Sequence, residues 1–77
     1  MKITYYQKHV IEYEEFQIER DGEICDYRKY PDTEFEDLIW KRVFYGNGEA
    51  REERVYSRGH VFALEKMYRN WLKESKQ

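Results

Sequence analysis

Apolar and polar residues alternate most clearly on either side of the Asp-Gly pair at residues 21–22. In the segment "FQIERDGEICDY", which spans residues 16–27, an alternating run precedes this pair and another follows it. An Asp-Gly pair between two such runs is typical of a two-residue β-hairpin turn. The register that follows places Arg20 opposite Glu23 and two apolar pairs on one core-facing side: Ile18 opposite Cys25, and Phe16 opposite Tyr27.

A second hairpin is predicted in "LIWKRVFYGNGEAREERVYS", residues 38–57. With residues 46–48 as a three-residue loop, Tyr45 pairs with Glu49. Opposite charges then face each other, and apolar residues do the same, as cross-strand pairs favour. The pairs expected from this register are Arg42 with Glu52, Lys41 with Glu53, and Ile39 with Val55.

A helix is the alternative for the first half of this region. Thr33 and Glu36, which follow Pro31, have the spacing of a capping box and would begin a helix that runs to Gly46. The apolar residues up to Ile39 fit helical spacing, but those after it would spread around the whole circumference. A strand is therefore favoured.

The first fourteen residues have the β-branched and aromatic composition of a strand, although residues 3, 6, 10 and 13 also fit a helical stripe. No Gly or Pro separates this segment from the next one. A single strand of about 18 residues would span roughly 60 Å at 3.3 Å per residue. We therefore expect a bend or bulge near Glu14 and Glu15, where the alternation changes phase.

The carboxyl-terminal segment predicts a helix that begins near Ser57 or Gly59 and ends at about Ser75. At 100° per residue its apolar residues share an arc of about 140°, which is the expected core face: Val61, Leu64, Met67, Tyr68, Trp71 and Leu72. The fold class is therefore α+β, a single domain with a small antiparallel sheet of four to five strands packed against one C-terminal helix. The strands are expected over about 2–13, 15–20, 23–30, 37–45 and 49–56, and the helix over about 59–75.

The length of 77 residues supports one small core, because a chain of this size buries only about 60% of its unfolded surface. Charged residues make up 39% of the chain, but eight Tyr, four Phe and two Trp supply the apolar area that folding needs. No run of 18 apolar residues is present, and the first residues lack the apolar core of a signal peptide. We expect no membrane span and a cytoplasmic location.

Charge is distributed unevenly along the chain. Residues 12–37 hold eleven acidic and three basic side chains, whereas residues 38–77 hold nine basic and five acidic ones, for a net charge of −2 overall. The acidic part suits a basic surface on another protein, with Tyr30 as an anchor beside the stiffening Pro31. Such charges also protect exposed strands from aggregation. The candidate partner-binding residues are Asp21, Glu23, Tyr30, Asp32, Glu34 and Glu36.

The helix carries a second candidate surface, on which basic residues surround an aromatic one within an arc of about 80°. Such a stripe is suited to holding a phosphate backbone and stacking a base, or to docking an acidic protein. The simpler interpretation is a solvated helix face with Phe62 folded onto the sheet edge. The candidate nucleic-acid-binding residues are Arg58, Phe62, Lys66, Arg69 and Lys73, with Lys76 beyond them.

Catalytic chemistry finds little support in the sequence. Cys25 and His9 are the only candidate nucleophile and base, but a lone cysteine opposite an isoleucine is typical of a small core residue. His60 is expected to cap the helix or to be exposed. Adjacent carboxylates such as Glu14 and Glu15 point to opposite faces of a strand. No zinc spacing, calcium loop or phosphate-binding loop is present, so no metal, cofactor or enzymatic activity is expected.

The sequence therefore predicts a small non-enzymatic protein-binding module, an inhibitor or adaptor of the kind that phages and mobile elements use, with a basic protein surface as its partner. The alternative is a nucleic-acid-binding module that uses the helix stripe. The opposite charges of the two halves also suit a head-to-tail homo-oligomer.

Overall fold

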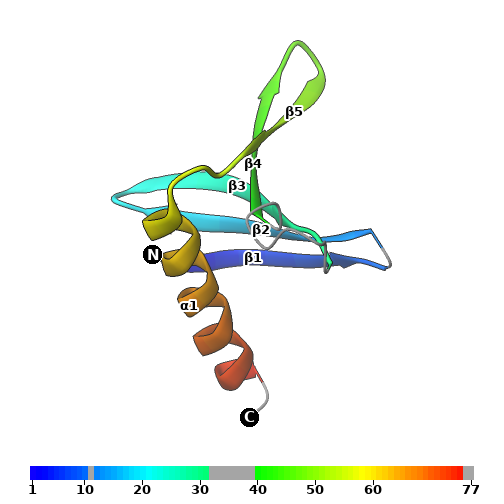
Figure 1. Ribbon diagram of the computed structural model, residues 1–77. Helices are drawn as coiled ribbons and strands as arrows, with labels where there is room; N and C mark the ends of the chain where they lie inside the picture. Colours follow the sequence, from blue (N-terminus) through cyan, green and yellow to red (C-terminus); the bar gives the residue numbers. More distant parts are fainter. Residues whose placement is uncertain (11, 32–39, 76–77) are drawn as a thin grey trace.

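The computed structural model describes residues 1–10, 12–31 and 40–75. In these residues an antiparallel sheet with the strand order β1-β2-β3-β4-β5 is followed by one helix. The helix lies against one face of the sheet, and the hairpin of β4 and β5 projects away from it (Figure 1). The expected α+β class is confirmed. The elements are β1 (Lys2–His9), β2 (Tyr13–Arg20), β3 (Glu23–Lys29), β4 (Trp40–Gly46), β5 (Glu49–Arg54) and α1 (Arg58–Ser75).

The hairpin of β2 and β3 has the predicted two-residue turn. Asp21 and Gly22 both have positive φ, 52° and 82°, as a turn that matches the right-handed twist of the strands requires. The predicted register is confirmed at every pair that was named: Arg20 with Glu23, Ile18 with Cys25, and Phe16 with Tyr27.

The register predicted for the second hairpin is wrong by one residue on β5. Asn47 and Gly48 form a two-residue turn with φ of 53° and 76°, so Gly46 belongs to the strand and pairs with Glu49. The primed turn matches the strand twist better than a three-residue loop does, and it therefore decides the register. The observed partners are Tyr45 with Ala50, Arg42 with Glu53, Val43 with Glu52 and Lys41 with Arg54. The predicted pair of Ile39 with Val55 includes a residue outside the described ones.

The capping-box alternative, a helix running to Gly46, is wrong for residues 40–46, which form β4. Residues 33–39, on which its beginning falls, lie outside the described residues. Helical packing would have spread the apolar side chains of this segment over all directions. In the strand, Trp40 instead points into the core while its neighbour Lys41 points to the other face of the sheet.

The first segment reverses direction earlier than predicted. β1 ends at His9, and the backbone N–H of Glu12 donates to the His9 carbonyl at 3.1 Å in the turn that follows. The bend expected at Glu14 and Glu15 is absent because both lie in the regular pairing of β2. A reversal allows Tyr6 and Phe16 to pair on the helix-facing side, which one long strand would not. An irregularity does occur between Ile3 and Tyr5.

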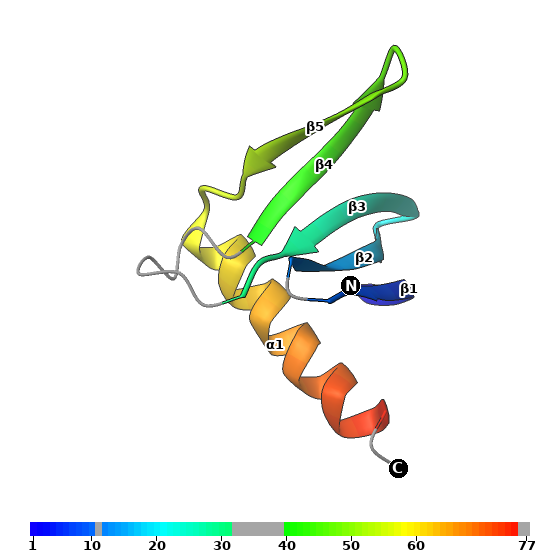
Figure 2. The same cartoon turned by 90° about the vertical axis from the view of Figure 1, so that its right-hand side faces the viewer.

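The core lies between the sheet and α1, where aromatic rings dominate. Phe16 is fully buried, and the centroid of its ring lies 5.5 Å from that of Trp40 and 5.7 Å from that of Tyr68. Figure 2 shows α1 on one side of the sheet, with the opposite face left uncovered by the helix. The expected core face of the helix is confirmed at five of its six residues, since Leu64 is buried and four others pack against the core: Val61, Met67, Tyr68 and Trp71. The sixth, Leu72, is half-buried.

The helix begins where the sequence predicted. The Ser57 hydroxyl accepts the backbone N–H of His60 at 3.3 Å, and the Ser57 carbonyl accepts that of Val61 at 3.0 Å. This is the pattern of an N-cap residue, whose side chain satisfies a free donor of the first turn. No helix among the described residues is both long and apolar enough to cross a membrane.

We expect Gly48→Ala to destabilise the fold by about 1–2 kcal/mol, because a φ of 76° is a left-handed conformation that costs a residue with a Cβ roughly this much. Gly46→Ala is the matched control, since nothing lies within 4 Å of the Cβ that it would add. We expect it to change stability by less than about 0.5 kcal/mol. Chemical denaturation measures both variants, and equal losses would contradict the two-residue turn.

Candidate functional site

Two large aromatic side chains are exposed on the outer side of α1 and on the segment that leads into it. Phe62 is 70% exposed and Tyr56 is 80% exposed. The simpler expectation, in which Phe62 folds onto the sheet edge, is therefore wrong. Basic side chains lie around both rings. We call this surface the basic aromatic face and define it by seven residues: Arg54, Tyr56, Arg58, Phe62, Lys66, Arg69 and Lys73.

Helical periodicity creates most of this face. Phe62, Lys66, Arg69 and Lys73 follow one another at intervals of four, three and four residues, so they share one side of the helix. The opposite side carries Leu64 and the rest of the core-facing residues. The packing of the core thus fixes which way the basic aromatic face points.

Two shallow grooves run along the basic aromatic face. The first has a volume of about 470 Å³ and lies between α1 and the end of β5, with Tyr56 among its lining residues. The second, of about 320 Å³, lies along the helix and is lined by Lys66 and Lys73 among others. Phe62, Glu65 and Arg69 line both grooves. An aromatic ring and a guanidinium group are therefore shared between two adjoining hollows.

Four cations of this face, Arg58, Lys66, Arg69 and Lys73, differ from the cations of the strands in their surroundings. Among the described residues, no carboxylate lies within ion-pair distance of Arg58, Lys66, Arg69 or Lys73, whereas several cations of the strands are paired. The guanidinium carbon of Arg54 lies 5.2 Å from the centroid of the Tyr56 ring. That distance is within the range of a cation–π contact.

Glu65 is the only carboxylate that lines either groove in the described part of the chain. A residue of β4 fixes the position of this carboxylate, because the indole Nε1–H of Trp40 donates to Glu65 Oε1 at 2.6 Å. Trp40 is fully buried, so this hydrogen bond is anchored in the core. The carboxylate is consequently held in place between the core and the two grooves.

The acidic partner surface predicted from the sequence is only partly described. Asp21 and Glu23 are exposed at the turn between β2 and β3, and the side chain of Asp21 is 94% exposed. Tyr30 lies beyond the other end of β3, away from this turn, and is half-buried. The remaining three candidates, Asp32, Glu34 and Glu36, lie outside the described residues.

Tyr30 belongs to a cluster around Glu52 on the sheet face that the helix does not cover. The Tyr30 hydroxyl donates to Glu52, Arg28 Nη1 lies 2.5 Å from Glu52 Oε1, and Lys41 Nζ lies 3.8 Å from Oε2. Arg28 also lies over the Tyr13 ring, 4.6 Å from its centroid. Sequence reasoning missed this cluster because the predicted register put Glu52 opposite Arg42. The signal for the correct register was the Asn-Gly pair, because a two-residue turn there places Glu52 beside Lys41.

Burial and hydrogen bonding shift the pKa values of two groups in this cluster. Burial and the hydrogen bond to Glu52 raise the pKa of Tyr30 to about 12. Burial alone would raise the pKa of Glu52, but the hydrogen bonds from Tyr30 and Arg28 and the nearby positive charges outweigh it and lower this pKa. Both shifts favour the ionised Glu52 as the acceptor of a neutral Tyr30.

A second carboxylate holds the helix to the sheet. The hydroxyls of Tyr6 and Tyr68 donate to Glu14 Oε2 at 2.9 Å and 3.0 Å. Burial and the neighbouring Glu14 raise the pKa of Tyr6 to about 12 and raise that of Tyr68 further. Glu14 is thereby a structural acceptor, and Glu15 points to the opposite face, where His9 contacts it at 3.2 Å.

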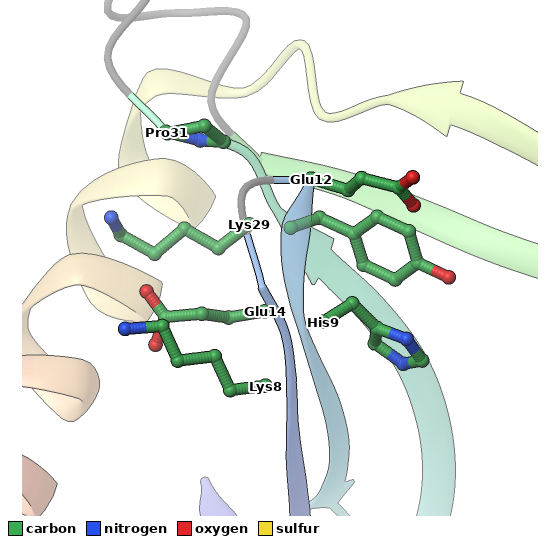
Figure 3. Close-up of a pocket in the computed structure, with 7 residues that line it drawn as sticks. Lys8, His9, Glu12, Glu14, Lys29 and Pro31 are labelled. Atoms are coloured by element: carbon green, nitrogen blue, oxygen red, sulfur yellow. The ribbon is translucent and has the colours of Figure 1, made fainter.

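A pocket of about 270 Å³ lies next to Glu14, at the end of the sheet where β1 turns into β2. Figure 3 shows that Lys8, Glu14 and Lys29 point to the side of the helix, whereas His9 points to the other side. Three charged lining groups thus gather on the helix side, while His9 lies apart from them on the other face of the hairpin. The carboxylate among these three groups, Glu14, already accepts the hydrogen bonds of Tyr6 and Tyr68 and therefore serves the packing of the helix.

The candidate catalytic residues are not brought together. Cys25 is half-buried on the helix-facing side, where its sulfur accepts a hydrogen bond from Arg42 Nη2 at 3.4 Å. His9 lies at the other end of the sheet and stacks on Tyr13. His60 is neither exposed nor limited to a cap, because its Nε2 lies 3.0 Å from the Tyr27 hydroxyl.

Burial and the nearby charges of Arg20 and Arg42 lower the pKa of His60, which favours the neutral ring. In the described part of the chain, no group of three or more His, Cys, Asp or Glu side chains is arranged to hold a metal ion.

Comparison of this chain with protein-family models, with curated proteins and with solved structures finds no match. The chemistry of the described surface is therefore the basis on which a function is assigned. Within the described part of the chain, the basic aromatic face combines exposed aromatic rings, several cations outside any observed ion pair, and two grooves.

We expect Glu52→Gln to lower the free energy of unfolding at pH 7 by about 1–3 kcal/mol, because it leaves Arg28 without its charged partner. The folded-state pKa of Glu52 is lower than its unfolded value of about 4.3, so its stabilisation is present above that pH and is lost as the pH falls below it. The difference between wild type and variant should therefore shrink between pH 7 and pH 3.

The control for this prediction is Glu53→Gln. Glu53 is adjacent but faces the other way, and its side chain is 51% exposed in an ion pair with the exposed Arg51. We expect a change of less than about 1 kcal/mol, since exposed pairs contribute little. Denaturant titrations at several pH values compare the two variants. Equal effects at every pH would show that the Glu52 cluster does not stabilise the fold.

Proposed function

We propose that this protein is a non-enzymatic module that binds single-stranded nucleic acid through the basic aromatic face. The observation that carries this proposal is the exposure of Phe62 and Tyr56 next to Arg58, Lys66 and Arg69, which have no ion-pair partner among the described residues. Cations neutralise phosphates, and aromatic rings stack on unpaired bases. The two kinds of side chain together match the two repeating parts of a single strand.

A single strand suits this surface better than a duplex. A duplex keeps its bases stacked on one another, so it would engage the cations and leave Phe62 and Tyr56 without a partner. Unpaired bases can instead turn toward the protein and stack on these rings. The grooves on either side of Phe62 provide space for such bases beside the helix.

The net charge of −2 is compatible with this function because charge is segregated on the molecule. Local potential, and not the total, governs the attraction of a charged ligand. Of the described residues, five basic side chains of the basic aromatic face and one carboxylate, that of Glu65, line the two grooves. A phosphate backbone that approaches this face therefore meets positive charge.

A second candidate function is the docking of a basic protein surface at the tip of the first hairpin, the leading interpretation of the sequence. The observation that favours it is an exposed apolar side chain among acids: Ile24 is 59% exposed and follows Glu23 directly. Asp21 lies at the same tip. Charge on such a rim accelerates association with an oppositely charged partner.

We expect the wild type to bind a mixed-sequence single-stranded oligonucleotide at low salt, and Phe62→Ala to weaken binding by roughly 1–3 kcal/mol through lost stacking. Arg69→Gln should weaken binding to all sequences and reduce the slope of log affinity against log salt by about 0.7. Fluorescence anisotropy over a series of salt concentrations measures both effects.

Ile24→Ala is the matched control, because Ile24 is also an exposed apolar side chain but lies on β3, outside the basic aromatic face. The affinity of Ile24→Ala for the single-stranded oligonucleotide should equal that of the wild type. If the wild type binds no oligonucleotide at low salt, the proposal is wrong and the hairpin tip becomes the leading candidate.

A further inference from the structure

Glu65 lies at a position where its charge is unfavourable for phosphate binding. It lines both grooves among cations, and its negative charge repels a phosphate that comes near. The core nevertheless holds it there, since the buried Trp40 donates its indole N–H to Oε1. A fixed carboxylate beside two aromatic rings is suited to the edge of a base and not to the backbone.

The two oxygens of the Glu65 carboxylate differ in their hydrogen bonding. None of the described side chains donates a hydrogen bond to Glu65 Oε2, whereas Oε1 is engaged by Trp40. A carboxylate oxygen is an acceptor only, so it attracts an N–H group and repels a carbonyl. Cytosine presents an amino group at position 4, where uracil presents a carbonyl oxygen.

We infer that Glu65 is a specificity-determining residue, which accepts a hydrogen bond from the exocyclic amino group of a base stacked on Phe62 or Tyr56. This inference rests on the proposed function, because it assigns a base preference to the same face. The protein then prefers strands whose bases carry amino groups, and it discriminates against uracil and thymine. Carboxylate acceptors read the cytosine amino group in this way in other settings.

The hydrogen bond from Trp40 determines how the side chain of Glu65→Gln should be oriented. In Glu65→Gln the buried indole N–H still requires an acceptor, because leaving it unsatisfied is costly. The amide oxygen takes that place, so the amide NH₂ group is presented to the groove. The groove then offers a donor where the wild type offers an acceptor, and the preference should reverse toward the uracil carbonyl.

The experiment compares oligo(dC) with oligo(dU), each about 12 nucleotides long, which is within the range that small binding domains occupy. These probes differ at position 4 of the base and lack the thymine methyl group. At pH 7.5 and low salt we expect the wild type to bind oligo(dC) about fivefold more tightly than oligo(dU). For Glu65→Gln we expect the ratio to fall below one.

Glu74→Gln is the matched control, because it removes one negative charge from an exposed position on the same helix, outside both grooves. It should leave the ratio of the two affinities unchanged. Equal binding of both probes by the wild type overturns the inference, even if Glu65→Gln fails to fold, and so does an equal shift of both affinities in a folded Glu65→Gln. In either case the proposed function stands, whereas it fails only if the wild type binds neither probe nor mixed sequences.

Discussion

The packing of Trp40 between the sheet and α1 holds the two parts of the molecule together. Its ring is fully buried, with ring centroids 5.5 Å from Phe16 and 6.2 Å from Tyr68, and its indole N–H reaches Glu65 on the helix. Its backbone carbonyl accepts the N–H of Val55 at 3.3 Å. One residue therefore ties β4, the segment after β5 and the helix to a common point, while the rest of the second hairpin extends beyond the core (Figure 1).

This arrangement determines which aromatic residues are left for the surface. Once Leu64 and Tyr68 pack toward Trp40 and Phe16, helical geometry turns Phe62 away from the core. Burying a side chain of this size contributes about 1.5–3 kcal/mol, and a mostly exposed ring forgoes most of that gain. A ligand that covers the exposed rings of Phe62 and Tyr56, as we propose, would recover part of that gain.

Local signals in the sequence determined the first hairpin and the helix but not the other two reversals. Asp21 and Gly22 are residues that tolerate positive φ, so their turn and register followed directly. In the second hairpin Gly46 resembled a loop residue, and one extra residue in the loop moved Glu52 to the wrong face. The reversal after His9 contains neither Gly nor Pro, and it is selected by the pairing of β1 with β2.

The candidate site divides in the same way between local and long-range causes. Helical periodicity alone brought Phe62, Lys66 and Arg69 to one side, and these were predicted. Tyr56 comes from the connection before the helix, and only the packing of the two segments makes it border the same groove. Trp40 and Glu65 are 25 residues apart in the chain, so their hydrogen bond has no signature in local sequence.

The basic residues of the helix and those of the sheet differ in their ion pairing. On the sheet, Arg28 and Lys41 both lie close to Glu52, and Arg51 lies 3.0 Å from Glu53, so these charges are satisfied within the fold. On the helix, the described residues place no carboxylate within ion-pair distance of Lys66 or of the other cations of its basic stripe. Unpaired exposed cations keep their long-range field, which falls off over about 10 Å at moderate salt. A chain that is acidic overall therefore carries a cluster of basic side chains on one face, beside the exposed rings, and this is the face on which we propose that an anionic strand binds.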